Sequence, residues 1–229
     1  MARIKFGMMM TDARGKLGGH VFTKAKSGAT IRTKVTPLNP KTSAQSEARS
    51  ALGANSQAWR TLTETQRLAW NSASQEVSKT NAFGDTYFPS GKNYFTAVNN
   101  NLRNIGGSVI LEPPALVEMP GLTSVDVNFD LLAEQLDIAP NYVGADVNIV
   151  LVCNATSGLS AGRYNFSGKY RKFAGFSLAG TPNSSAIYDL YVSKFGVPSA
   201  GQKVSFEFYL VNELTGQVSP RVTATVLLG

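Results

Sequence analysis

An α+β fold is predicted, made of an N-terminal extended arm with a β-hairpin, a small helical module and a C-terminal antiparallel β-sandwich of immunoglobulin-like type. Three observations predict it. Residues 1–41 are basic and β-prone without a clean apolar face, residues 42–107 repeat apolar residues at helical spacing, and residues 108–229 alternate apolar and polar residues in short runs. These ranges are the three predicted domains.

The hairpin is predicted from residues 15–35, GKLGGHVFTKAKSGATIRTKV. Two β-prone runs flank Ser27-Gly28, and glycine supplies the positive φ that a two-residue turn needs. Such a turn pairs Phe22 with Thr33, and neither face of the hairpin is wholly apolar. A lone hairpin is marginal in water, so we expect this one to gain stability by joining another sheet or another subunit.

Three helices are predicted at about 43–61, 64–78 and 91–105. A capping box, in which Thr and Gln stand three residues apart, precedes the first two helices at Thr42 and Thr63. The third helix shows an apolar stripe at helical spacing. The residues expected to face inward are Ala48, Leu52, Trp59, Leu62, Leu68, Trp70, Phe95, Val98, Leu102 and Ile105.

Roughly seven strands are expected after residue 107, in runs such as VDVNFD, VNIVLVCNA, RYNFSGKYRKF, SAIYDLYVS and KVSFEFYLVN. The sequence lacks the Cys…Trp…Cys pattern of antibody domains, so the immunoglobulin-like prediction concerns architecture only. Cys153 is the only cysteine. A single cysteine cannot form an intramolecular disulfide, and the apolar residues around Cys153 in the sequence predict that it lies in the core.

The residues available for catalysis and metal binding are few, so we predict a protein that is not an enzyme and uses no cofactor. His20 is the only histidine and has no acid nearby in sequence, which favours a turn or interface role over a catalytic base. Asp126, Asp130 and Asp137 fit a solvated strand face better than a Ca²⁺ site. The cations and aromatic residues interleaved over 163–173 fit a half-buried strand pair better than a single-strand nucleic-acid platform.

Charge is concentrated near the N-terminus. Residues 1–60 hold 11 of the 22 basic residues and two of the 15 acidic ones, a net charge of +9, so the remainder carries −2 of the total +7. This asymmetry predicts a polyanionic partner, either nucleic acid or an acidic protein surface. No apolar run approaches the ~18–20 residues of a membrane helix, so no membrane partner is expected.

Two roles therefore remain open: an assembly protein whose arm binds neighbouring subunits, and a nucleic-acid-binding protein whose arm neutralises phosphates. The arm's charges alternate with β-branched and aromatic residues, as in strands that add to another sheet, so the assembly role is favoured. The predicted partner-binding residues are Arg14, Lys16, His20, Phe22, Lys24, Lys26, Ile31, Arg32, Lys34 and Val35.

Residues 14–105 also carry a recognisable series of motifs. A Gly-rich basic hairpin is followed by NPxTxxQxxxR from Asn39, by LTxxQRxAW from Leu62 and by SGxNxF from Ser90. In this series the chain resembles a family of virion-associated proteins from tailed phages and prophages of gut Bacteroidota, crAss-like phages included. The resemblance covers a little under half of the chain.

The resemblance implies a phage virion structural protein. The role we expect first is a capsid-associated auxiliary or decoration protein, anchored by its basic arm to the major capsid protein or to neighbouring copies, with a homo-oligomer as one form. A neck or tail ring protein is the alternative. The implied location is the virion, after assembly in the host cytoplasm. The family supplies no catalytic residues to transfer to this chain.

Overall fold

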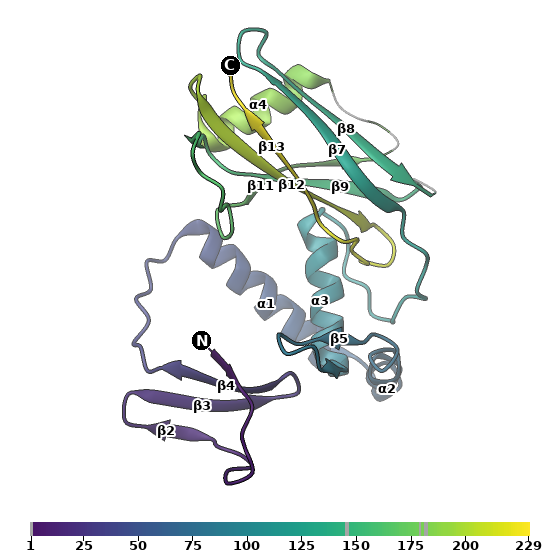
Figure 1. The fold of residues 1–229 in the computed structure, drawn as a ribbon. Helices are drawn as coiled ribbons and strands as arrows, with labels where there is room; N and C mark the ends of the chain where they lie inside the picture. The colour runs from purple at the N-terminus through teal and green to yellow at the C-terminus, as the bar shows by residue number, and fades with distance from the viewer. Residues whose placement is uncertain (1, 145–146, 179, 181–182) are drawn as a thin grey trace. The chain divides into compact units, whose positions relative to one another are not determined.

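The structure, a computed structural model, describes residues 2–144, 147–178, 180 and 183–229 (Figure 1). The described residues form an α+β protein with four helices and several antiparallel sheets. The chain divides into two compact units. Unit 1 comprises Met1–Asn100 and Ile110–Pro113, and unit 2 comprises Asn101–Val109 and Pro114–Gly229. The predicted arm and most of the predicted helical module thus belong to one unit.

The N-terminal part of unit 1 is a four-stranded antiparallel sheet with the order β1-β4-β3-β2 (Figure 1). Its strands are β1 (Ala2–Ile4), β2 (Gly15–Leu17), β3 (His20–Ala25) and β4 (Gly28–Thr33). The separate extended arm is not confirmed, because β1 pairs with β4 as an edge strand of this sheet.

The predicted hairpin is present as β3 and β4, but the predicted register is wrong by two residues. Phe22 pairs with Ile31, not with Thr33, and Ala25 pairs with Gly28. The glycine has the expected positive φ, 110°, but it follows the turn and does not form its centre. A shift by an even number of residues leaves each side chain on its predicted face.

Three helices follow in the chain: α1 (Ser43–Thr61), α2 (Glu64–Ala73) and α3 (Gly91–Asn104), the last divided between the units after Asn100. The capping box at Thr63 is complete, since its side chain accepts from the Gln66 N–H while the Gln66 side chain accepts from the Thr63 N–H. At Thr42 the side chain accepts from the Gln45 N–H. A short hairpin of β5 (Lys79–Thr80) and β6 (Thr86–Tyr87) precedes α3.

Aromatic residues form the core of unit 1. Trp70 and Phe95 are fully buried, and their ring centroids lie 5.2 Å apart in an edge-to-face arrangement. The Trp70 indole N–H donates to the Leu111 carbonyl over 2.8 Å. Leu62 and Val98 are buried as predicted.

Three inward assignments are wrong: Leu52 and Leu68 are 53% and 59% exposed, and Ala48 is exposed. Leu68 and Trp70 stand two positions apart, about 200° around a helix, so both cannot face one core. Ala48 and Leu52 lie in the first half of α1, which consists largely of exposed residues.

Besides the end of α3, the described residues of unit 2 form a five-stranded antiparallel sheet, a long two-stranded hairpin and a helix. The hairpin is β7 (Gly121–Asp130) with β8 (Gln135–Val143), and the helix is α4 (Ser184–Phe195). In the sheet, β12 pairs with β9, β10 and β13, and β9 also pairs with β11. These strands are β9 (Ile149–Ala155), β10 (Leu159–Ser160), β11 (Arg171–Ser177), β12 (Gln202–Asn212) and β13 (Val222–Leu227).

One core joins these elements: side chains of β9 and β12 pack against β7, β8 and α4 in a single buried cluster. Cys153 is fully buried within it, which confirms its predicted place, and burial raises the pKa of its thiol. The opposite face of the sheet buries a smaller cluster of Val150, Val152, Tyr209 and Val211, with Ile105 packed against it.

The predicted strand at SAIYDLYVS is wrong, since this segment forms α4. Ile187, Tyr188 and Tyr191 are its buried residues, and this spacing of one, then three, is helical. The Asn183 side chain accepts from the Ser185 N–H as the N-cap. The predicted strand over 163–173 is also mostly absent, because β11 begins only at Arg171. A five-stranded sheet facing a hairpin and a helix leaves the immunoglobulin-like sandwich unconfirmed.

Candidate interaction surface

The register of the N-terminal sheet sorts its side chains onto two chemically different faces, because cross-strand partners share a face. The apolar face carries Ala2, Ile4, Leu17, His20, Phe22, Lys24, Ala29 and Ile31. The basic face carries Arg3, Lys16, Val21, Thr23, Thr30 and Arg32. The structure therefore brings the predicted residues Phe22 and Ile31 together as a cross-strand pair, while Lys16 and Arg32 share the other side.

The apolar face has little cover from the described chain. None of residues 2–33 is buried; Phe22 and Ile31 are half-buried, and Leu17 is 72% exposed. A hollow of about 310 Å³ on this sheet is lined by Ala2, His20, Ile31, Arg32 and Thr33. An isolated small sheet with an uncovered apolar face is marginal in water, so this face is suited to packing against another molecule.

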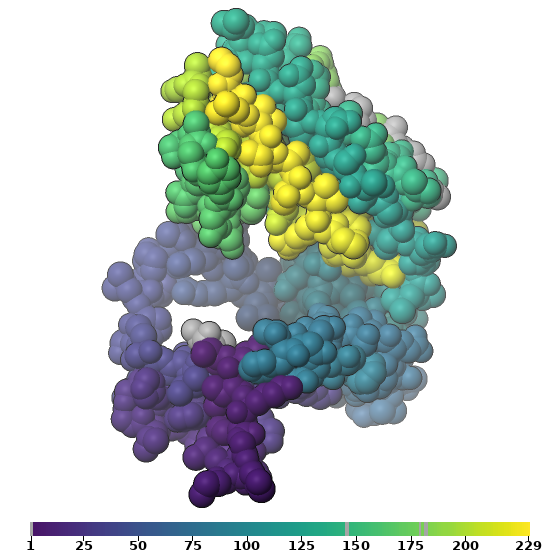
Figure 2. Space-filling view, viewed as in Figure 1, coloured from purple at the N-terminus to yellow at the C-terminus, as the bar shows by residue number. Residues whose placement is uncertain are grey.

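The loop between β1 and β2 adds a second exposed apolar feature, which we call the Met loop, residues 7–10. Met8 and Met9 are fully exposed, and Met10 is 54% exposed. The loop protrudes from the sheet in dark purple (Figure 2). Methionine side chains are flexible and adapt to irregular apolar surfaces. The sequence prediction missed this loop, although three consecutive Met after a Gly were the available pattern.

Several predicted partner-binding cations have contacts within their own unit. Asp12 lies 3.2 Å from the Lys24 Nζ and 3.4 Å from the Arg14 Nε. The Lys24 hydrogen bond is the main reason that the pKa of Asp12 lies below its ordinary value. The Lys26 ammonium donates to the Pro89 carbonyl over 3.5 Å.

Other predicted cations have no such contact. Within the described residues, no hydrogen bond or ion pair involves the side chains of Lys16, Arg32 or Lys34, which makes them the free charges of this surface. Val35 lies beyond β4 and is 68% exposed. His20 lies on the apolar face and lines the hollow, and its interface role stays a prediction.

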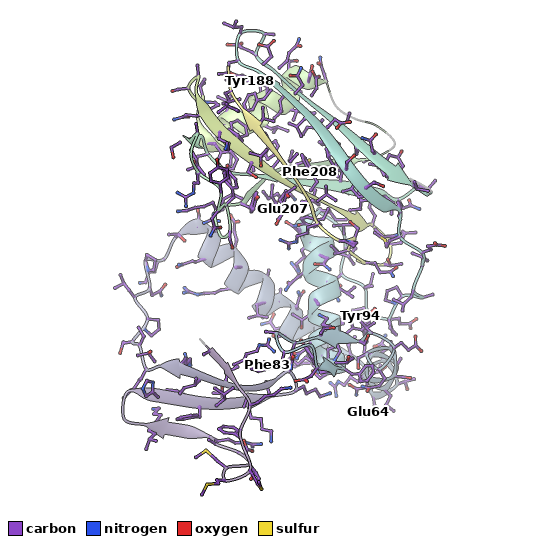
Figure 3. The ribbon with its side chains drawn as sticks, in the orientation of Figure 1. Glu64, Phe83, Tyr94, Tyr188, Glu207 and Phe208 are labelled. Carbon is purple, nitrogen blue, oxygen red and sulfur yellow. The ribbon has the colours of Figure 1, made fainter. Side chains whose placement is uncertain are left out.

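The sheet is joined to the β5–β6 hairpin of unit 1 by polar contacts. Asn81 donates from its Nδ2 to the Ser27 carbonyl over 3.1 Å, and the Lys5 Nζ lies 2.9 Å from the Asp85 Oδ1. The Lys5 ammonium also lies 5.3 Å from the centre of the Phe83 ring, which Figure 3 labels. Hydrogen bonds from Lys5 and then Asn81 lower the pKa of Asp85 below its ordinary value of 3.8.

We expect the Asp85 carboxyl to titrate below 3.8, and its midpoint to move toward 3.8 in a Lys5→Ala variant. Because the folded-state pKa is lowered, the contact stabilises the fold above 3.8 and is lost as the pH falls through the folded pKa. NMR titration of side-chain carboxyl carbons measures this midpoint. Lys79→Ala, a change at another exposed lysine, is the control and should leave it unchanged; a wild-type midpoint at 3.8 or above contradicts the Lys5–Asp85 contact.

No family model, curated protein or solved structure matches this chain. Among the described residues, no helix has both the length and the apolar character to cross a membrane. In the same part of the chain, no group of three or more His, Cys, Asp and Glu side chains is placed to hold a metal ion. The N-terminal sheet is therefore the candidate site because of its exposed apolar face and its free cations, not because of similarity to a known protein.

Proposed function

We propose that this protein is a non-enzymatic structural component of a tailed-phage virion, and in the first place a capsid-associated auxiliary or decoration protein. The N-terminal sheet packs against an acidic, partly apolar surface of the major capsid protein or of a neighbouring copy. Support comes from the motif resemblance over residues 14–105 and from the exposed chemistry of this sheet.

One observation carries the proposal: a four-stranded sheet that contains no buried residue has an apolar face on one side and free cations on the other. Apolar contact supplies affinity, whereas charge complementarity supplies specificity and orientation. A surface of this kind fits a protein partner better than bare phosphates, which would use the cations and leave Phe22 and Ile31 in water.

Unit 2 is the outward-facing module in this proposal. Its sheet and its β7–β8 hairpin form two β layers around one core. We propose that these two layers are an immunoglobulin-like sandwich to which α4 has been added. Modules of that kind commonly decorate capsids or occur in tail parts.

The basic face favours nucleic acid as a second candidate partner. Arg3, Lys16, Arg32 and Lys34 all belong to the same short sheet or its immediate end. If several of them met phosphates, each tenfold increase in salt concentration would lower the logarithm of the binding constant by about 0.9 for each phosphate contact.

The deciding experiment is the copy number of the protein in gradient-purified particles, measured by quantitative mass spectrometry against the major capsid protein. Hundreds of copies support the capsid role. A number of about six or twelve, as expected for a ring, moves the protein to the neck or tail. Absence from particles, together with salt-sensitive DNA binding by the purified protein, overturns the virion role in favour of nucleic-acid binding.

A further inference from the structure

The outer face of β12 in unit 2 carries polar side chains that its core does not use. Figure 3 labels two neighbours on this strand, Phe208 and Glu207. Phe208 is fully buried in the core, whereas Glu207 lines an open hollow on the other face. The register places Thr223 of β13 and Asn154 of β9 on either side of Glu207. Thr225 likewise lies beside Ser205. The floor of this groove is therefore a row of hydroxyl, amide and carboxylate groups.

Glu207 is held in place by two donors that reach the same oxygen. The Asn154 Nδ2 and an Arg221 guanidinium nitrogen each lie 2.9 Å from Glu207 Oε1. In the described part of the chain, no hydrogen bond reaches Oε2. The Glu207 side chain is only 12% exposed, so an oriented acceptor with spare lone pairs stands at the floor of the groove.

The wall of the groove is the loop of residues 161–170, which carries two tyrosines. In Figure 2 this green segment lies beside the yellow β13. Two hollows of about 470 and 440 Å³ adjoin here, and Tyr170 lines both. The Tyr170 hydroxyl lies 2.9 Å from Ser205 Oγ, which fixes that ring, while the Tyr164 side chain is 87% exposed. An exposed ring above a polar floor provides one stacking surface and several hydrogen-bonding groups.

The three cations that line the two hollows are already engaged. Arg221 is paired with Glu207, the Lys203 ammonium lies 4.8 Å from the Tyr164 ring centre, and the Arg163 Nε donates to the Asn165 carbonyl. A phosphate or carboxylate ligand would have to displace these contacts and approach the Glu207 carboxylate, which repels it. A neutral ligand that is rich in hydroxyl groups meets no such cost, because each hydroxyl both donates and accepts.

From this geometry we propose that the groove between β12, β13 and the 161–170 loop binds a neutral carbohydrate. One sugar ring packs against Tyr164 beside Thr223, and the hydroxyl groups of a neighbouring ring of the same chain donate to Glu207 Oε2 and exchange hydrogen bonds with Asn154 in the adjoining hollow. The proposal rests on unit 2 alone and holds whichever particle component the N-terminal sheet joins.

The test uses the full chain with named probes: mannohexaose, maltohexaose and cellohexaose as neutral sugars, hexagalacturonic acid as an acidic sugar, and a 15-nucleotide oligo-dT. Saturation-transfer NMR detects binding, and calorimetry measures Kd. At least one neutral sugar is expected to bind with a millimolar or lower Kd. Binding of only the acidic sugar or only oligo-dT overturns the proposal, as does the failure of all three neutral sugars at about ten times that concentration.

Three variants distinguish the groove from other surfaces. Tyr164→Ala, at an exposed ring, should weaken the neutral sugar about tenfold, the order of one aromatic contact. Glu207→Gln should also weaken the neutral sugar, whereas it should strengthen any anionic ligand by removing a negative charge. Phe88→Ala removes an exposed ring from unit 1 and should change nothing. Equal effects of Tyr164→Ala and Phe88→Ala would place the binding elsewhere.

Discussion

A chain that lacks residues 1–36 is expected to fold, to remain soluble and to be missing from purified particles. The deletion removes the apolar face, the basic face and the Met loop together. It takes no side chain from either core, because no described residue before Asn55 is buried. Complementation of a deletion phage, followed by mass spectrometry of purified particles, measures incorporation as the ratio to the major capsid protein. Normal incorporation of the truncated chain would contradict the proposal that the N-terminal sheet anchors the protein.

Two pairs of substitutions separate the roles of the faces. Phe22→Ser with Ile31→Ser removes the central apolar pair, and Lys16→Gln with Arg32→Gln removes two free charges. If the partner is a protein, the apolar double variant should reduce incorporation at least as strongly as the charge variant. If the partner is nucleic acid, only the charge variant should matter, and its effect should shrink at high salt. Thr23→Ala with Thr30→Ala, which alters a cross-strand pair on the same hairpin, is the matched control.

Replacing Phe206 by alanine is expected to destabilise unit 2 by about 3–5 kcal/mol. The ring is fully buried, and the centroids of Phe129, Phe173, Tyr191 and Phe208 lie 6.1 to 6.3 Å from its own. These neighbours belong to β7, β11, α4 and β12 itself. The cavity left behind therefore cannot close by a shift of one side chain. Urea denaturation followed by circular dichroism measures the loss.

The matched control for this substitution is Tyr164→Ala, which removes a ring that is 87% exposed. Its effect on the free energy of unfolding should stay within about 0.5 kcal/mol, as for surface positions in general. A loss below about 1 kcal/mol for Phe206→Ala would show that this ring is not packed as the structure has it.

Local chemistry made much of the fold predictable. The capping box at Thr63 and the N-cap at Thr42 mark where two helices begin, although the second half of the predicted box at Thr42 is absent because Gln45 Oε1 has no hydrogen-bond partner. The stripe from Phe95 to Leu102 correctly marks the buried side of α3. The segment that became α4 was mistaken for a strand because its Tyr, Ile and Val residues have high β propensity. Packing of Ile187, Tyr188 and Tyr191 against the sheet overrides that preference, and such packing is not visible in a short window of sequence.

The candidate interaction surface was predictable in composition but not in arrangement. The alternating residues predict the hairpin and its cations, and the two-residue error in register does not change the face on which Phe22 and Ile31 lie. The contribution of β1 was missed, because a three-residue strand that pairs with β4 across about 25 residues of chain has no local pattern of its own. The groove on β12 was missed for the same reason: Asn154, Glu207 and Arg221 meet only through strand pairing.

The two edges of the N-terminal sheet are β1 and β2, and each is only three residues long. A strand that adds to so short an edge forms very few main-chain hydrogen bonds, each with a net worth of about 1 kcal/mol. Pairing of copies through these edges alone is therefore expected to be weak. In the proposed assembly role, lasting attachment would require several weak contacts to form at once on a prepared site, and a misplaced subunit could then leave a growing lattice and be replaced.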